Sequence, residues 1–506
     1  MPTGHGDWRN TKWHGMRQYW KVLLATIVLL STCLFLFPPV NQEPLKALQT
    51  SISKSKPEQT KSEFYQWRTL TSFTRINSSD STYHMTTEQL CRHFPKDKLN
   101  DIQPILKTGH GVIERARQSL LSTSACLDNL LIFSDLEEEL EGHHVIDVIA
   151  DLPRELLQSD NQTIPYFELQ KQAMDGTLDG PGMSKGEGWR TDKFKFLPAI
   201  SRAWLMAPNK SWYVFYEGDT YVVWDSVFRL LEHFDPDVPH YFGSPSPGAD
   251  HGGGIITWFA NGGPGCIISR GAMRKLVKDD WDRSSGEWKG SKLAEKNWNE
   301  TLTNCCGDSS LGSVLWNENV DLEGLWPSFD PHPLHGVPFS DLYWCQPVLT
   351  MHKTEHQDAL KLWQFEWDHR KSDRPLLYRD LAVDFLNMAN MTRKLDWDNG
   401  EWDSYRPAAD DPSQPNESVD NCERACARAE GCFQWTYHLQ RCYFVRSFRL
   451  GRAKAPMVED DRKDREWSYE DQRFIAGWDA DKIKRWISER PCDEVQWVRP
   501  SIERIF

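Results

Sequence analysis

Two carboxylates separated by one glycine form the motif of this chain that is best suited to chemistry. Glu217, Gly218 and Asp219 directly follow an unbroken apolar and aromatic run, residues 212–216. That run predicts a strand covered on both faces, as in a parallel sheet, and ligands bind at the carboxyl ends of such strands. Two crowded acids repel unless a cation lies between them, and Mg²⁺ or Mn²⁺ combines carboxylates with substrate phosphates. The motif predicts a metal–diphosphate site, although acid-Gly-acid sequences also form ordinary β-turns.

Three later segments carry further candidate groups. A glycine-dense loop over residues 252–265 allows a ligand to approach the backbone closely, although a flexible surface loop has the same composition. Asp308 follows two adjacent cysteines and begins a helical pattern, where an N-cap role is the ordinary interpretation. His352 stands just past an apolar strand, and a single histidine is more often structural than a ligand.

The elements that must position these groups follow from hydrophobic patterns. Strands are predicted at residues 102–106, 130–133, 145–149 and 241–243, and helices at 112–122, 189–204, 226–233, 270–278 and 354–370. Strand, glycine turn, helix and strand make a βαβ unit near the start. Thr108, Gly109 and Asp135 lie at its strand ends, where a nucleotide would bind. The chain has no G-x-G-x-x-G, so a dinucleotide site is not favoured.

Composition limits the possible partners. The chain has 506 residues, 24 of them tryptophan, which suits one large core and carbohydrate-stacking surfaces. Its formal net charge of −14 argues against nucleic-acid binding, because binding to the phosphate backbone requires a basic surface.

One segment is apolar enough to cross a membrane. Residues 22–37 with their flanks, 22–40, reach spanning length, and the basic residues before them favour a cytosolic location for residues 1–21. A cleaved signal peptide is the alternative, but Pro38 and Pro39 stand where small residues would mark the cleavage site. The prediction is an uncleaved anchor.

The rest of the chain divides by composition. The predicted parts are a stem (41–95), a catalytic domain (96–371), a linker (372–412), a cysteine-pinned module (413–450) and a helical tail (451–506). Phe64, Tyr65 and Trp67 leave open that part of the stem packs on the body.

Five sequence blocks in a fixed order resemble glycosyltransferase family 31, and most closely its fringe and core 1 β1,3-galactosyltransferase branch. The blocks are WYVFYEGDTYVVWDSVFRLLEHFDP (212–236), YFGSP (241–245), FANGGPGCIISRGAM (259–273), CCGDSSLG (305–312) and LTMHK (349–353). The resemblance covers roughly residues 100–370. The segment Cys422–Cys442 resembles a PAN/Apple module, with two of its three usual disulfides.

The resemblance implies an α/β fold of the GT-A type with a mostly parallel central sheet. It also implies a type II Golgi membrane protein that acts as an inverting glycosyltransferase, with a UDP-sugar as donor, Mn²⁺ or Mg²⁺ as cofactor, and a glycan or glycoprotein as acceptor. Transfer of a hexose in β1,3 linkage is the expected reaction.

The resemblance also implies roles for individual residues, each assigned by its position in the matching sequence blocks. Asp219, with Glu217 and His352, would bind the metal, and Asp308 would be the general base. The nucleotide-sugar would contact Thr108, Gly109, Asp135, Glu217, Asp219, Gly262 and Gly263. Trp258 and Phe259 are candidates for stacking on the acceptor or, alternatively, for packing in the core.

One departure keeps other functions open. The family usually has Asp-Asp-Asp or Asp-x-Asp where this chain has Glu-Gly-Asp. Either Glu217 reaches the metal through water, or Asp219, His352 and the diphosphate hold it. The alternatives to an enzyme are a non-catalytic chaperone of the same fold and a binder of carbohydrate or protein that works through the module, which could also mediate self-association.

Cysteines and sequons agree with an oxidising lumen. Of twelve cysteines, Cys33 lies in the predicted anchor, so at least one of the remaining eleven is unpaired or pairs between chains. The candidate disulfides are Cys91–Cys126, Cys306–Cys345, Cys422–Cys442 and Cys426–Cys432. The N-x-S/T sequons begin at Asn77, Asn161, Asn209, Asn299, Asn390 and Asn416.

Overall fold

The computed structural model describes residues 63–76, 82–281, 286–288, 290–400, 403–408, 410–459, 462–463 and 465–504. By internal contacts the chain divides into residues 1–63 and 64–506, and the described helices and strands belong to the second unit. The predicted tail (1–21), the anchor (22–40), much of the stem and Asn77 lie outside the described residues. Within the described part, no helix has the length and apolar character that a membrane span requires.

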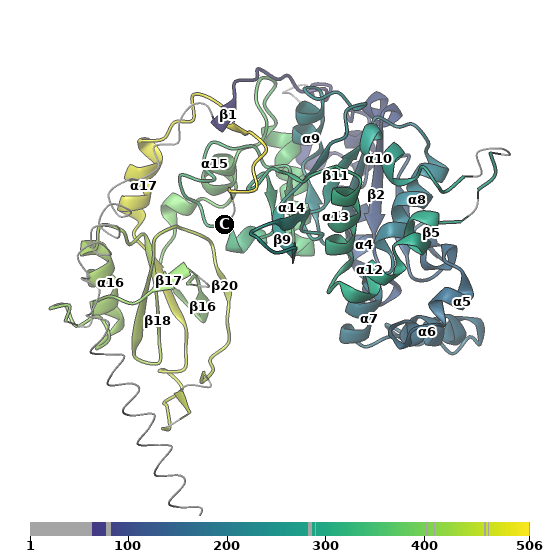
Figure 1. The fold of residues 1–506 in the computed structure, drawn as a ribbon. Coiled ribbons are helices and arrows are strands. Elements are labelled where there is room, and N and C mark those ends of the chain that lie inside the picture. Colours follow the sequence, from purple (N-terminus) through teal and green to yellow (C-terminus); the bar gives the residue numbers. More distant parts are fainter. Residues whose placement is uncertain are drawn as a thin grey trace, which may run out of the picture. The chain divides into compact units, whose positions relative to one another are not determined.

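The largest sheet among the described residues is an eight-stranded mixed sheet (Figure 1). Its strands, in spatial order, are β12 (Glu323–Gly324), β8 (Tyr241–Gly243), β11 (Cys266–Ser269), β6 (Trp212–Glu217), β2 (Ile102–Lys107), β3 (Leu131–Ser134), β5 (His143–Asp147) and β4 (Glu138–Leu140). β11 and β4 run against the other strands. The sheet is therefore mostly parallel, but β6 itself has one parallel neighbour, β2, and one antiparallel neighbour, β11.

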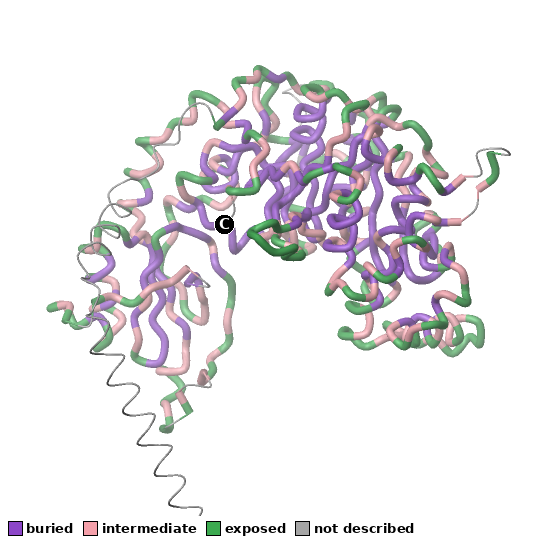
Figure 2. Tube along the Cα trace, viewed as in Figure 1, coloured by how far each residue is buried: buried purple, intermediate pink, exposed green. Residues whose placement is uncertain are grey.

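Helices cover both faces of the sheet, which explains the unbroken apolar run of β6. Side chains alternate along a strand, so Trp212, Val214 and Tyr216 enter one core while Tyr213 and Phe215 contact the other. The first core includes residues of α4 (Ile113–Leu120), α9 (Trp224–Leu231) and α14 (His356–His369). The second includes residues of α8 (Phe196–Met206), α10 (Arg270–Leu276) and α13 (Gly307–Asn317). Figure 2 shows the strands buried between these layers.

Two smaller sheets adjoin the carboxyl end of β6. The first has the order β13 (Phe329–Asp330), β14 (Thr350–Met351) and β7 (Tyr221–Val222). The second is a hairpin of β9 (Pro245–Asp250) and β10 (Ile256–Ala260). The hairpin occupies much of the predicted glycine-dense loop, whose glycines hid the strand pattern.

The predicted helix over residues 189–204 is two helices in the structure. α7 spans Lys185–Asp192, α8 begins at Phe196, and the chain between them turns. Lys195 lies in that turn with its side chain in the core, beside Asp135 and Asp192. A buried charged network therefore interrupts what the sequence presents as one amphipathic pattern.

The C-terminal part is organised differently from the prediction. Its five-stranded sheet has the order β15 (Lys394–Leu395), β21 (Ile475–Trp478), β18 (Gln434–His438), β19 (Arg441–Val445) and β17 (Ser404–Tyr405). β15 and β17 come from the predicted linker and β21 comes from the predicted tail. The linker assignment for 372–412 is wrong. Among the described residues of the predicted tail (451–506), the one α-helix is α17 (Ala480–Ser488). Two-residue strands in Asp- and Pro-rich sequence carry no periodic signal, so only tertiary pairing defines them.

One helix of the cysteine-rich module and one strand pair also bear on the predicted divisions of the chain. α16 (Val419–Arg428) contacts β18 and β19 inside the cysteine-rich module. At the other end of the unit, β1 (Phe64–Tyr65) pairs with β22 (Trp497–Val498). Trp67 stacks on Tyr65 and on His233 of the body. Residues 64–67 of the predicted stem therefore pack on the body, the alternative that the aromatic residues left open.

The structure confirms part of the disulfide pairing predicted from the sequence. The structure pairs Cys91 with Cys126, Cys305 with Cys306, Cys345 with Cys492, Cys422 with Cys442, and Cys426 with Cys432. The predicted pair Cys306–Cys345 is wrong, because the returning C-terminal segment brings Cys492 to Cys345 across 147 positions of sequence. Among the described cysteines, Cys266 is free and buried.

The described sequon asparagines lie at the surface. Asn161, Asn209, Asn299, Asn390 and Asn416 are all exposed, as a glycan acceptor must be.

Candidate functional site

The acidic motif forms a tight turn at the carboxyl end of β6. Glu217 is the last residue of β6, and Thr220 leads into β7. The hydroxyl of Thr220 donates a hydrogen bond to the carbonyl of Gly263 over 2.6 Å. A Cβ atom at position 218 would lie 2.8 Å from the backbone nitrogen of Ala116 in α4, so only glycine lets the turn pack this closely on the helix.

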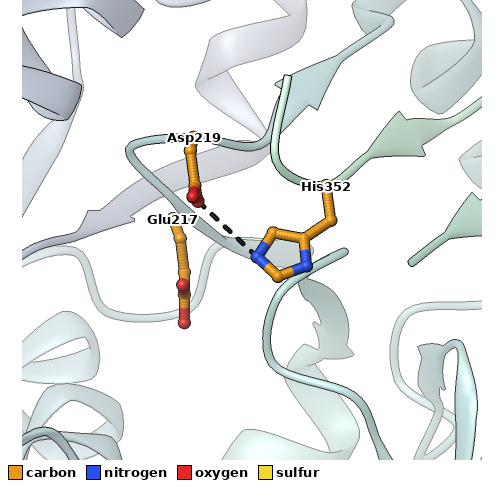
Figure 3. A group of neighbouring side chains, drawn as sticks. All are labelled: Glu217, Asp219 and His352. Atoms are coloured by element: carbon orange, nitrogen blue, oxygen red, sulfur yellow. Dashed lines mark ion pairs between the residues drawn. The ribbon is translucent and has the colours of Figure 1, made fainter. Parts of the chain in front are cut away.

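A strand pairing brings His352 to this turn. β14 runs antiparallel to β7, with Met351 opposite Tyr221, so the residue after Met351 comes beside the residues that precede β7. His352 Nε2 lies 3.6 Å from Asp219 Oδ1. Figure 3 shows the two side chains facing each other, with Glu217 beside them.

These three residues suit a divalent cation. One ligand atom from each of Glu217, Asp219 and His352 lies within 4.8 Å of the others. Asp219 Oδ1 is buried and accepts no hydrogen bond from the described residues, so it is an oxygen available to a cation. Burial lowers the pKa of His352, against the opposing effect of the nearby Asp219 and Glu217 charges, and a neutral imidazole is the form that binds metals.

Two basic side chains of the protein also contact the acidic pair. Lys107 Nζ lies 3.0 Å from Glu217 Oε1 and 2.7 Å from Asp192 Oδ2. Burial alone would lower the pKa of Lys107, but the charges of Asp192 and Glu217 outweigh it and raise that pKa. Arg115 Nη1 lies 2.7 Å from Asp219 Oδ2. Glu217 is thus held mainly by a buried lysine, whereas Asp219 keeps one oxygen free.

The residues predicted to contact the nucleotide gather at the ends of β2 and β3. Asp135 Oδ1 accepts a hydrogen bond from the backbone N–H of His110 over 2.8 Å, and Asp135 Oδ2 lies 3.2 Å from Lys195 Nζ. Lys195 also donates to the carbonyl of Thr108 over 2.7 Å. A Cβ atom at Gly109 would lie 2.8 Å from Asp135 Oδ2, so glycine is needed for this close arrangement.

Asp308 stands at the start of α13, directed towards the glycine loop. Its carboxylate accepts hydrogen bonds from the backbone N–H of Gly262 (2.8 Å) and of Ser309 (2.9 Å). Burial raises the pKa of Asp308, although these two N–H donors lower it. The same loop touches the histidine, because a Cβ atom at Gly263 would lie 2.2 Å from the His352 ring.

One pocket connects the acidic turn to Asp308. It has about 420 Å³ of space, part of it open to solvent, and Lys107, Glu217, Gly262 and Asp308 are among its lining residues. A carboxylate that keeps its proton at a higher pH than usual therefore shares a pocket with the acidic turn. This arrangement can accept a proton next to a bound anionic group, which is what group transfer between two oxygen atoms requires.

Trp258 and Phe259 lie on β10, against α13. Phe259 is buried, and Trp258 is partly buried against the hydrophobic cluster that includes residues of α8, α10 and α13. For both residues the structure supports packing as the role.

Comparison with known proteins gives one family match for this domain. Residues 169–308 match the family model described as Fringe-like. The match includes Glu217, Asp219, Gly262, Gly263 and Asp308, and it indicates a glycosyltransferase family. A search of curated proteins found no match.

Lys107, Arg115, Asp192 and Lys195 were not among the site residues predicted from sequence. Lys107 is the last residue of a central strand, and ligands bind at such strand ends. Its position in the sequence could therefore have predicted that it belongs to the site. Arg115 lies inside a helical pattern with other charged residues, and nothing in the sequence distinguishes it from a solvent-exposed arginine.

Proposed function

We propose that the chain is an inverting glycosyltransferase that transfers a hexose from a UDP-sugar to a hydroxyl of a glycan or glycoprotein acceptor, with β1,3 linkage as the expected product. The observation that carries the proposal is the convergence of Asp219 and His352 from different strands beside a pocket that Asp308 lines. The Fringe-like match over this region supports the class of reaction.

Asp219 and His352 are the residues that would hold Mn²⁺ or Mg²⁺, with Glu217 adjacent. When bound, the divalent cation supplies Lewis-acid stabilisation of the charge that develops on the departing diphosphate. Glu217 is engaged by Lys107, so its part in the site is to orient that lysine and keep it charged at the pocket wall. Thr108, Gly109 and Asp135 would bind the nucleoside.

Asp308 is the proposed general base. Inversion in one step requires the acceptor hydroxyl to attack from the face opposite the leaving group, and a carboxylate within hydrogen-bond reach must take its proton. The N–H groups of Gly262 and Ser309 hold the Asp308 carboxylate in one orientation. Its raised pKa makes it a stronger base than an exposed aspartate.

Calorimetry with UDP and Mn²⁺ tests the binding half of the proposal. Asp219→Asn should abolish metal-dependent UDP binding, because it removes the charged oxygen that faces His352. The exposed Asp175, at the end of α6 (Ile164–Met174), provides a matched control, and Asp175→Asn should bind as the wild type does. Unchanged UDP binding by Asp219→Asn would contradict the site.

A panel of UDP-sugars tests the catalytic part of the proposal. Release of UDP from one donor in the presence of an acceptor and Mn²⁺ is the expected result, and the donor that works names the hexose. UDP binding with no release from any donor would instead indicate a non-catalytic scaffold of the same fold.

The sequence also supports a place for the enzyme in the cell. We propose a type II topology with the anchor at residues 22–40 and the body in the Golgi lumen. N-glycans attached at the exposed sequons would support the luminal location of the body. The module over residues 413–450 is proposed to be PAN/Apple-like and to position acceptors or mediate self-association. Removing it should change the acceptor KM or the oligomer size.

A further inference from the structure

Asp219, the residue proposed to hold the metal most firmly, already contacts a cation of its own chain. Arg115 Nη1 lies 2.7 Å from Asp219 Oδ2. The other oxygen, Oδ1, is buried, has no hydrogen-bond donor among the described residues, and faces His352 Nε2. The two oxygens of one carboxylate therefore have different partners, a guanidinium on one side and an open position on the other.

The close packing of the acidic turn on α4 creates this contact. The Cβ atom that Gly218 lacks would lie 2.9 Å from the Cβ of Arg115 and 2.8 Å from the nitrogen of Ala116. A larger residue at position 218 would push the turn away from the helix and separate Asp219 from Arg115. The glycine between the two acids thus places an arginine, as well as the two carboxylates, at the site.

Arg115 differs from Lys107 in its freedom to move. The Lys107 side chain is 9% exposed and is held by Asp192 and Glu217 together. The Arg115 side chain is 49% exposed, and Asp219 is the acid with which it forms an ion pair. A half-exposed arginine with one charged contact can turn to a new partner at little cost.

A divalent cation and the Arg115 guanidinium cannot both lie against Asp219 without repulsion, because like charges a few ångströms apart oppose each other in a partly buried site. A cation bound between Asp219 and His352 would therefore displace the guanidinium from Oδ2. A diphosphate bound to that cation would offer the displaced group a new anionic partner, and arginine forms paired hydrogen bonds with phosphate oxygens.

We propose that Arg115 is a diphosphate-binding residue that occupies the metal ligand Asp219 while the site is empty of nucleotide and turns to the diphosphate when metal and nucleotide bind. This inference rests on the proposed function of the same site. It assigns Arg115 two opposite effects, one on metal affinity and one on nucleotide affinity, which a purely structural arginine would not have.

The first test measures Mn²⁺ alone, by calorimetry or electron paramagnetic resonance. Arg115→Gln should bind Mn²⁺ about two- to fivefold more tightly than the wild type, because a competing cation is gone. The second test measures UDP at saturating Mn²⁺. There Arg115→Gln should bind UDP about 10- to 100-fold more weakly, because a charge-assisted contact to phosphate is lost.

Arg117 provides the matched control. It lies on the same helix with similar exposure, 41%, and its ion pairs are with Glu114 and Glu141, away from Asp219. Arg117→Gln should leave both affinities at wild-type values. Arg115→Lys keeps the charge but loses the planar fork, so it should retain wild-type Mn²⁺ affinity and fall between wild type and Arg115→Gln in UDP affinity.

Each outcome decides one part of the proposal. If Arg115→Gln changes neither affinity, or if it weakens Mn²⁺ binding, the proposal is overturned. Tighter Mn²⁺ binding with unchanged UDP binding overturns the diphosphate contact and retains the competition. A wild-type protein that binds no UDP with Mn²⁺ contradicts the proposed function itself, which separates that failure from a failure of Arg115.

Discussion

At the scale of single residues, the proposed transfer reaction depends on Asp308 as its general base. Its carboxylate lines the same pocket as Glu217 and is held by two backbone N–H groups. Asp308→Asn preserves the size of the side chain but removes its basicity. Turnover should fall about 10²- to 10⁴-fold, the usual contribution of a general base, while UDP binding stays close to that of the wild type.

Steady-state rates and UDP calorimetry on the same preparation measure both effects. The exposed Asp321, which follows α13, gives the control Asp321→Asn, for which wild-type rates are expected. Wild-type turnover in Asp308→Asn would show that another group takes the proton.

The pKa of Asp308 leads to a second residue-scale prediction. Burial raises this pKa, and the base works only when deprotonated. As the pH falls through the raised pKa, the fraction of active carboxylate falls, so activity should be lost at a higher pH than an exposed aspartate would allow. A profile of kcat/KM against pH should show this acidic limb in the wild type, and the residual activity of Asp308→Asn should lack it.

At the scale of elements, the loop between β10 and β11 holds the histidine in place. Gly263 accepts the Thr220 hydroxyl through its carbonyl, and a Cβ atom there would overlap the His352 ring at 2.2 Å. Gly263→Ala should therefore move the ring and weaken Mn²⁺-dependent UDP binding, with a loss of about tenfold or more if one ligand is displaced.

Gly188 in α7 is the control for this change, because a Cβ atom there would meet no atom within 4 Å. Gly188→Ala should leave UDP binding unchanged and, since alanine favours helices, should keep or slightly increase stability. Equal UDP affinity in Gly263→Ala and wild type would mean that His352 does not bind the metal.

At the scale of the whole molecule, the C-terminal part contributes to the core behind the acidic turn. One hydrophobic cluster contains Tyr221 of β7 and Met351 of β14 together with Phe448, Trp478 and Ile483. The two short strands that position Asp219 and His352 are thus packed on side chains from beyond residue 440. A protein truncated after residue 371 should bind UDP with Mn²⁺ much more weakly than the full chain, or fail to fold.

The Cys345–Cys492 disulfide provides a milder test of the same connection. It closes a loop of 147 positions, and a disulfide typically stabilises a protein by about 2–4 kcal/mol. Replacing both cysteines by serine should lower the melting temperature, as followed by circular dichroism. The control pair is Cys426 and Cys432, which are only six positions apart and should contribute less. An unchanged melting temperature would show that packing alone holds the C-terminal segment.

The local sequence pattern was sufficient to predict much of the sheet at the proposed nucleotide site. β2 is buried throughout and β3, β5 and β6 are buried over most of their length, as their consecutive apolar residues predict. The positions of Thr108, Asp135 and Glu217 at strand ends followed directly. The antiparallel direction of β11 could not be predicted, because an apolar strand buried on both faces has the same sequence whichever way it runs.

The remaining features depend on contacts between residues far apart in the chain. Short strands such as β15 and β17, the partner of Cys345 and the proximity of Arg115 to Asp219 leave no periodic trace in the sequence. Amino-acid sequence alone identified which carboxylates and which histidine could bind a metal, because residue type and strand position are local properties. Only the folded chain could show which basic side chains form ion pairs with those carboxylates, because these pairs depend on distances between side chains of different elements.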